Sequence, residues 1–179
     1  MMLIHNRTFL VLVIVTLNQS EWKRAEVTIL LINVLIVDDD EEVRNMLSSI
    51  LEGEGYLVEA VENGKKAISI CEKTPFDVAL LDIDLPDIKG TELLRMLKEI
   101  QPRMVKIIIT GHPSIENAAK SVNEEADGYV LKPFNVVELL EMIKRLLAEK
   151  ANDYFKMFTE VERVEKNTSV FKYQHPGKW

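Results

Sequence analysis

From residue 33 onward, the pattern of apolar and polar positions changes repeatedly between two forms. One form predicts strands and the other predicts helices. Short apolar runs are typical of strands buried in a sheet. They predict strands at residues 34–37, 57–61, 78–83, 105–110 and 128–131. Between the runs, apolar residues recur at helical spacing, as with Val43, Leu47 and Leu51. This spacing predicts helices at residues 41–53, 64–75, 91–100 and 114–123, and from Asn135 on.

Strands and helices therefore alternate five times over residues 33–150. Such alternation predicts a parallel sheet with helices on both faces, since parallel neighbours need crossover connections. Crossovers are right-handed, so the expected fold class is α/β, a doubly wound three-layer domain. Ligands of such sheets lie at the carboxyl ends of the strands, where the strand order reverses. The residues that follow each strand are the candidates for function.

Residues 1–32 form an N-terminal extension before this pattern. Its apolar run, Phe9–Val15, follows His5 and Arg7 and is similar to the apolar core of a signal peptide. The run is too short to span a membrane, and no small-residue cleavage site follows it. Alternatively, the start of the gene is assigned too far upstream, because the domain would begin naturally at Leu31 if that residue were the initiator and were read as methionine. We expect no membrane span.

Residues 151–179 form a C-terminal extension. Apolar residues at helical spacing predict that the last helix continues for several turns, with Tyr154, Phe155, Phe158, Val161 and Val164. From Asn167 the chain is polar and predicts a loose tail. The apolar stripe could pair with a second copy or a partner, or fold back on the core.

The composition is that of a soluble globular protein, with 47% hydrophobic and 28% charged residues. The net charge of −7 argues against nonspecific binding to DNA or anionic membranes. Cys71 is the single cysteine, which excludes an internal disulfide and suits a reducing cytosol. We expect it in the core, and we expect a cytoplasmic protein.

Acidic residues follow two of the predicted strands. Asp38, Asp39 and Asp40 follow the first, and Asp82 ends the third. Asp40 is the expected cap of the next helix, and capping would also explain Asp38 and Asp39 taken alone. Several carboxylates at one sheet edge repel, and Mg²⁺ with oxygen ligands neutralises them. Asp82 stands among core residues, where it is either a satisfied structural acid or a nucleophile that forms an acyl phosphate.

Two further strand ends carry groups that suit phosphate. Thr110 offers a hydroxyl, and Gly111 leaves space and exposes its N–H. Lys132 ends an apolar strand and precedes Pro133, and its ammonium suits phosphate oxygens. Asp84 could add a backbone carbonyl to a metal site while its side chain faces outward. Metal, lysine and hydroxyl together would neutralise a phosphoryl group in transit.

Four segments in order resemble the receiver domains of two-component response regulators. They are Val34–Asp40, Val78–Pro86 with Gly90, Ile107–Gly111 and Ala126–Phe134. The resemblance covers residues 33–150 and implies a flavodoxin-like five-stranded sheet in the order 2-1-3-4-5.

The resemblance implies a role for each candidate residue. Asp82 would be the phosphoacceptor for the phosphohistidine of a histidine kinase. Asp38 and Asp39 would be the acidic pair that shares Mg²⁺ with it, together with the Asp84 carbonyl. Thr110 would be the switch hydroxyl, and the phosphate-binding lysine would be Lys132.

Tyr129 would be the aromatic rotamer switch, although a partly buried aromatic of an edge strand is the alternative. Phosphorylation would draw Thr110 toward Asp82, and Tyr129 could then rotate inward. The rotation would remodel the face made by the helix at 114–123, the strand at 128–131 and the helix from Asn135. That face, or the C-terminal helix, could also form a homodimer.

We therefore expect a stand-alone receiver for phosphorelay signal transduction. Residues 151–179 are too few for a winged-helix or enzymatic output domain, so no direct nucleic acid binding is expected. The expected partners are a sensor histidine kinase or phosphotransfer protein and an unknown downstream protein. The chain would catalyse only its own aspartyl phosphorylation and dephosphorylation.

Two other interpretations of these residues compete with the receiver. Asp82-Ile-Asp84 matches the Asp-x-Asp pattern of haloacid-dehalogenase-type phosphatases. Pro86 stands where those enzymes usually have threonine, and the acidic pair lies upstream of the nucleophile strand. A receiver fold retained only for docking is the other reading, and the complete set of site residues argues against it.

Overall fold

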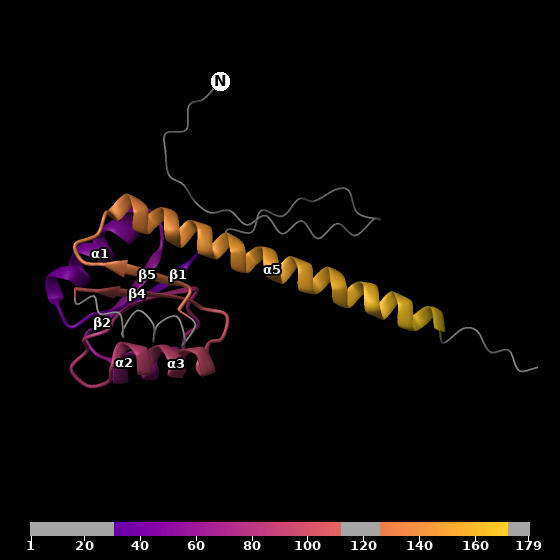
Figure 1. The fold of residues 1–179 in the computed structure, drawn as a ribbon, viewed down its shortest axis with the longest axis horizontal. Coiled ribbons are helices and arrows are strands. Elements are labelled where there is room, and N and C mark those ends of the chain that lie inside the picture. Colours follow the sequence, from indigo (N-terminus) through magenta and orange to yellow (C-terminus); the bar gives the residue numbers. More distant parts are fainter. Residues whose placement is uncertain (1–30, 112–125, 172–179) are drawn as a thin grey trace, which may run out of the picture. The chain divides into compact units, whose positions relative to one another are not determined.

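The structure, a computed structural model, describes residues 31–111 and 126–171, with side-chain surroundings up to residue 153. Its centre is a five-stranded sheet in the order β2-β1-β3-β4-β5 (Figure 1). All four neighbouring pairs are parallel. The strands are β1 (Asn33–Val37), β2 (Leu57–Val61), β3 (Val78–Asp82), β4 (Val105–Thr110) and β5 (Gly128–Leu131). The predicted fold class and strand order are confirmed.

The helices of the described residues are α1 (Glu41–Gly53), α2 (Gly64–Cys71), α3 (Gly90–Ile100) and α5 (Val136–Phe171). Asp40 caps α1 as predicted, because its carboxylate accepts the N–H of Glu42 at 2.8 Å. Asn63 caps α2 by accepting the N–H of Lys66 at 2.9 Å. The helix predicted at residues 114–123 and residues 1–30 of the N-terminal extension lie outside the described residues.

The end of α2 differs from the prediction. The sequence predicted a helix as far as Pro75, but α2 ends at Cys71. The Gln101 side-chain amide donates to the carbonyls of Cys71 and Thr74, at 2.7 Å each. Its oxygen accepts the N–H of Phe76 at 2.8 Å. A side chain from the end of α3 thus holds the chain in a turn where the helical pattern alone would continue.

The chain divides into two compact units, residues 1–134 and 135–179, and the second contains α5. The helix runs without a break to Phe171, which confirms that it continues past residue 150. The loose tail predicted from Asn167 is wrong for residues 167–171, because the helix continues through this stretch. Leu139, Ile143 and Leu146 are its buried residues within the described side chains. The predicted boundaries of the domain at residues 33 and 150 stay predictions.

Both faces of the sheet are buried in the first unit. Leu35, Leu81 and Ile108 belong to a core cluster to which α2 and α3 also contribute. Alternate strand residues such as Ile36 and Leu80 are equally buried. The helix α1 lies on the opposite side of the sheet from α2 and α3 (Figure 1). Burial on both faces explains the continuous apolar runs, and it leaves the strand ends as the places where polar side chains can gather.

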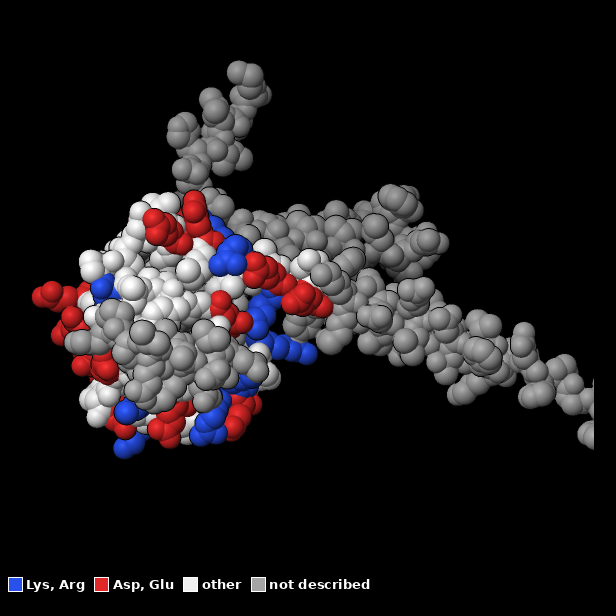
Figure 2. Space-filling model, viewed as in Figure 1, with Lys and Arg blue, Asp and Glu red and all other residues white. Residues whose placement is uncertain are grey.

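The surface of the described residues carries mixed charge. Acidic and basic side chains are interspersed on the face seen in Figure 2. Among the described helices, none is both long enough and apolar enough to cross a bilayer.

Candidate functional site

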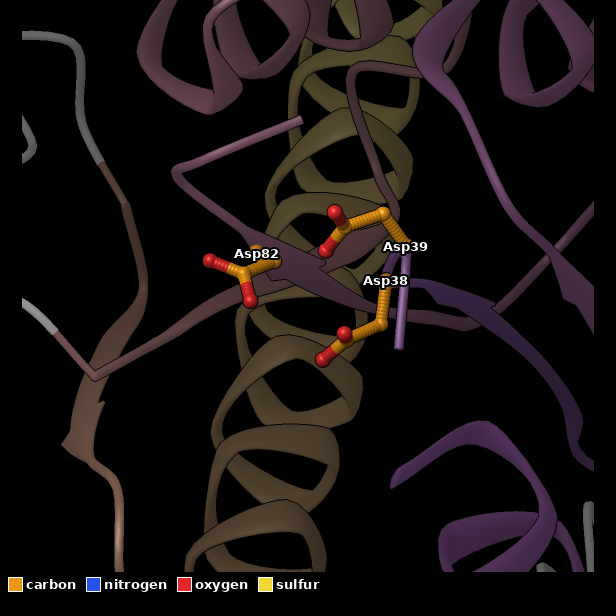
Figure 3. A group of neighbouring side chains, drawn as sticks. All are labelled: Asp38, Asp39 and Asp82. Carbon is orange, nitrogen blue, oxygen red and sulfur yellow. The ribbon is translucent and has the colours of Figure 1, made fainter. Parts of the chain in front are cut away.

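Three carboxylates gather at the carboxyl edge of the sheet. Asp38 directly follows β1, and Asp82 is the last residue of the neighbouring strand β3. One carboxylate oxygen each of Asp38, Asp39 and Asp82 lies within 4.8 Å of the other two (Figure 3). Asp38 is 2% exposed and Asp82 is 6% exposed, whereas Asp39 is open to solvent. Two buried acids and one exposed acid therefore face one space.

Lys132 reaches into this space from the end of β5. Its Nζ lies 2.5 Å from Oδ2 of Asp38 and 2.5 Å from Oδ2 of Asp82. Its backbone N–H donates to the carbonyl of Thr110 at 2.8 Å, and the Lys132–Pro133 peptide bond is cis. One ammonium thus connects the ends of β1, β3 and β5, three strands that are far apart in the sequence.

Thr110 and Tyr129 complete the set of predicted residues. Thr110 ends β4 and is fully buried. Asp82 is level with Ile109 on that strand, so Thr110 lies one residue beyond Asp82 along the adjoining strand. The Tyr129 ring packs against the core cluster, and its buried hydroxyl has no hydrogen-bond partner in the described part of the chain. The tyrosine therefore faces inward.

The oxygen donors of this site fit Mg²⁺. The three carboxylates are hard ligands of the kind that Mg²⁺ prefers, and two of them are buried. The Asp84 N–H donates to Oδ1 of Asp82 at 3.0 Å, which turns the chain after β3. The Asp84 side chain is exposed, as the sequence predicted for a residue that would offer only its carbonyl.

A family model, described as the response regulator receiver domain, matches residues 34–144. The chain belongs to this family. All the predicted site residues lie within the matched region. The resemblance noted in the sequence is thereby confirmed, and the receiver is a module of phosphorylation-driven signalling in two-component systems.

Known proteins agree with this assignment. An NtrX-like response regulator of Rickettsia bellii is 35% identical over 152 residues, which are 80% of this chain and 32% of that protein. The chain thus spans about a third of that relative's length. A CheY-like receiver domain protein of Methanospirillum hungatei has 43% identity and a TM-score of 0.67, over 69% of this chain and 98% of that structure.

A second solved structure is a response regulator of Burkholderia pseudomallei with a phosphorylated aspartic acid, a calcium ion and citrate. It is 27% identical to this receiver with a TM-score of 0.61, and the match covers 77% of this chain and 86% of that structure.

The charged groups of the receiver site alter one another's pKa values. Burial raises the pKa of Asp38 above its usual value, and the hydrogen bonds from Lys132 and the Asp40 N–H only partly offset this effect. Burial alone would lower the pKa of Lys132, but its bonds to Asp38 and Asp82 outweigh burial and leave that pKa raised. The lysine is therefore charged at neutral pH, as a group that binds anionic oxygens must be.

The structure adds one residue to the surroundings of the receiver site. The Arg44 guanidinium donates to the backbone carbonyl of Asp38 at 2.7 Å. No sequence motif identifies Arg44 as part of the site. Its position in the sequence is nevertheless informative. Arg44 lies in the first turn of the helix that follows Asp38–Asp40, and its side chain is long enough to contact the Asp38 backbone.

Proposed function

We propose that this receiver accepts a phosphoryl group on Asp82 from the phosphohistidine of a sensor histidine kinase or phosphotransfer protein. Mg²⁺ would be held by the carboxylates of Asp38, Asp39 and Asp82 and by the Asp84 carbonyl. The observation that carries the proposal is the position of Lys132, 2.5 Å from both Asp38 and Asp82. A half-buried cation beside a buried carboxylate suits a reaction that brings further negative charge to that carboxylate.

The transfer exchanges one bond for another. A bond forms between an Asp82 carboxylate oxygen and phosphorus, and the bond from phosphorus to the donor imidazole nitrogen breaks, so the electron pair leaves with the imidazole. The Asp84 N–H fixes the orientation of the Asp82 carboxylate. Lys132 would then hold a phosphoryl oxygen, and the Thr110 hydroxyl would donate to another. Mg²⁺, when bound, would neutralise the charge of the gathered oxygens.

Phosphorylation would act on other proteins through Thr110 and Tyr129. Movement of Thr110 toward the phosphoryl group would open space beside β5, and the inward position of Tyr129 would then be favoured. The buried Tyr129 hydroxyl, which has no hydrogen-bond partner among the described residues, supports this role, because a small rearrangement could supply a partner. The NtrX-like relative is about three times as long as the region it shares with this chain, so a stand-alone receiver without direct nucleic acid binding stays a prediction. A cytoplasmic location also stays a prediction.

The proposal is tested with acetyl phosphate and Mg²⁺, followed by the intact mass. We expect one added phosphoryl group that requires Mg²⁺ and disappears in Asp82→Asn. Asp40→Asn is the matched control. Asp40 is an acidic residue that directly follows Asp39, but its side chain caps α1, and an asparagine can form the same cap. This variant should label like the wild type. Labelling that persists in Asp82→Asn would refute the assignment, and turnover of a small phosphomonoester would favour a phosphatase.

A further inference from the structure

The loop that follows Asp82 is attached to the start of another helix. Residues 83–89 connect β3 to α3. Within this loop, the Asp87 carboxylate accepts the N–H groups of Gly64 and Lys65 at 2.9 Å each. These are the first two residues of α2, and the three residues together are called the Asp87 clasp below. The clasp joins the loop beside the phosphoacceptor to a helix from another part of the chain.

The clasp depends on a close approach between loop and helix. A Cβ atom added to Gly64 would lie 3.2 Å from Cβ of Ile88, the residue after Asp87. The amino end of a helix carries a partial positive charge that favours a carboxylate. Burial is the largest single influence and raises the pKa of Asp87, but the hydrogen bonds from the N–H groups of Lys65, Gly64 and Ile88 together outweigh it, so the net pKa is depressed. The carboxylate that holds the loop is therefore ionised at neutral pH.

The loop is fixed at its base as well as at its tip. At the base, the Gly90 N–H donates to the carbonyl of Ile83 at 2.9 Å. Asp84 lies between the base and the clasp, and its own N–H bonds to Asp82. Hydrogen bonds therefore fix the loop on both sides of Asp84 and at the Asp84 N–H itself. Its carbonyl is the group that the proposed Mg²⁺ site would use.

We infer that Asp87 is a positioning residue for the phosphorylation site. It holds the loop against α2 so that the Asp84 backbone is already in place before Mg²⁺ binds. This inference rests on the proposed function. Without the clasp, the loop must be ordered at the moment of binding, and that ordering weakens the affinity for the ion. If Asp87 instead only caps α2, its loss would leave Mg²⁺ binding unchanged.

Calorimetric titration of the full chain with Mg²⁺ separates these two roles. The matched control is Asn63→Ala, which removes a side-chain cap from the same helix without touching the loop. We expect Asp87→Ala to raise the Kd for Mg²⁺ about 5–10-fold, somewhat below the effect of groups that contact metal ligands directly. Asp87→Asn keeps an acceptor oxygen and should recover most of the affinity, and Asn63→Ala should stay within about twofold of the wild type.

The same variants are then labelled with acetyl phosphate over a range of Mg²⁺ concentrations. We expect the Mg²⁺ concentration for half-maximal labelling to rise in Asp87→Ala, while the rate at saturating Mg²⁺ is retained. A wild-type Kd in Asp87→Ala, or an equal change in Asn63→Ala, overturns the inference and leaves the proposed function intact. A wild-type chain that neither binds Mg²⁺ nor becomes labelled removes both.

Discussion

Gly90 is the position where one added methyl group should affect stability and phosphorylation together. A Cβ atom there would lie 2.1 Å from the carbonyl oxygen of Asp82 and 2.6 Å from Cα of Ile83. Both are backbone atoms, so no side chain can rotate away. In Gly90→Ala, the end of β3 or the start of α3 must move by about 1 Å to reach an ordinary contact.

The expected cost follows from what moves. The shift strains packed surroundings, at about 1–3 kcal/mol, and weakens the Gly90 to Ile83 hydrogen bond, at about 1 kcal/mol. Alanine is the better helix former by about 1 kcal/mol, which offsets part of the loss. We expect a net destabilisation of about 1–3 kcal/mol. Because the displaced backbone carries Asp82, labelling by acetyl phosphate should also fall, by about 10- to 100-fold.

Gly53→Ala is the matched control for this measurement. Gly53 ends α1, and an added Cβ there would meet nothing within 4 Å. We expect this variant to match the wild type or to gain up to about 1 kcal/mol in urea unfolding, with labelling unchanged. If Gly90→Ala is as stable as Gly53→Ala and labels at the wild-type rate, the close approach at Gly90 does not constrain the site.

Three further outcomes are expected. Lys132→Met leaves the buried carboxylates of Asp38 and Asp82 facing each other, so urea unfolding without metal should show a loss of about 3–5 kcal/mol. Added Mg²⁺ should restore more stability to this variant than it gives the wild type, and equal gains would contradict the arrangement. Asp38→Asn should be more stable than the wild type at neutral pH. Folding raises the pKa of Asp38 above its ordinary value of 3.8. Ionisation of this carboxyl in the folded protein therefore lowers the free energy of unfolding at pH values above the raised pKa, and this loss fades as the pH falls toward 3.8. Urea midpoints of Asp38→Asn and the wild type should therefore converge toward acid pH, and a constant gap would argue against the raised pKa. Gln101→Ala removes three hydrogen bonds to the α2–β3 connection and should cost about 2–3 kcal/mol in thermal unfolding. Labelling of this variant at saturating Mg²⁺ should stay at the wild-type rate, and a lower rate would show that the connection also serves the site.

The convergence of the acids and the lysine could be predicted because it follows from topology. Asp38, Asp82 and Lys132 each end an apolar run, and parallel strands bring such ends to one edge of the sheet. The runs themselves were easy to recognise, since both faces of the sheet are buried and each strand is apolar throughout. Strand bounds from the sequence therefore agree with the structure to within a residue at every strand.

Contacts made by long side chains across the fold could not be predicted in the same way. The α2 helix ends early because Gln101, which is 30 residues away, bonds to the carbonyl of Cys71. The Asp87 clasp joins residues 23 apart, and no local pattern signals it. Such contacts depend on how two loops meet in space, whereas hydrophobic periodicity reports only whether a segment is buried.

The position of Lys132 has a consequence for how the fold and the signal are related. The lysine serves as an internal counter-ion, so part of the negative charge of the two buried acids is balanced without capturing an ion from solution. A chain built in this way can fold where divalent ions are scarce. On the proposed function, Mg²⁺ would then govern how fast the site reacts, and the folded state would persist without it.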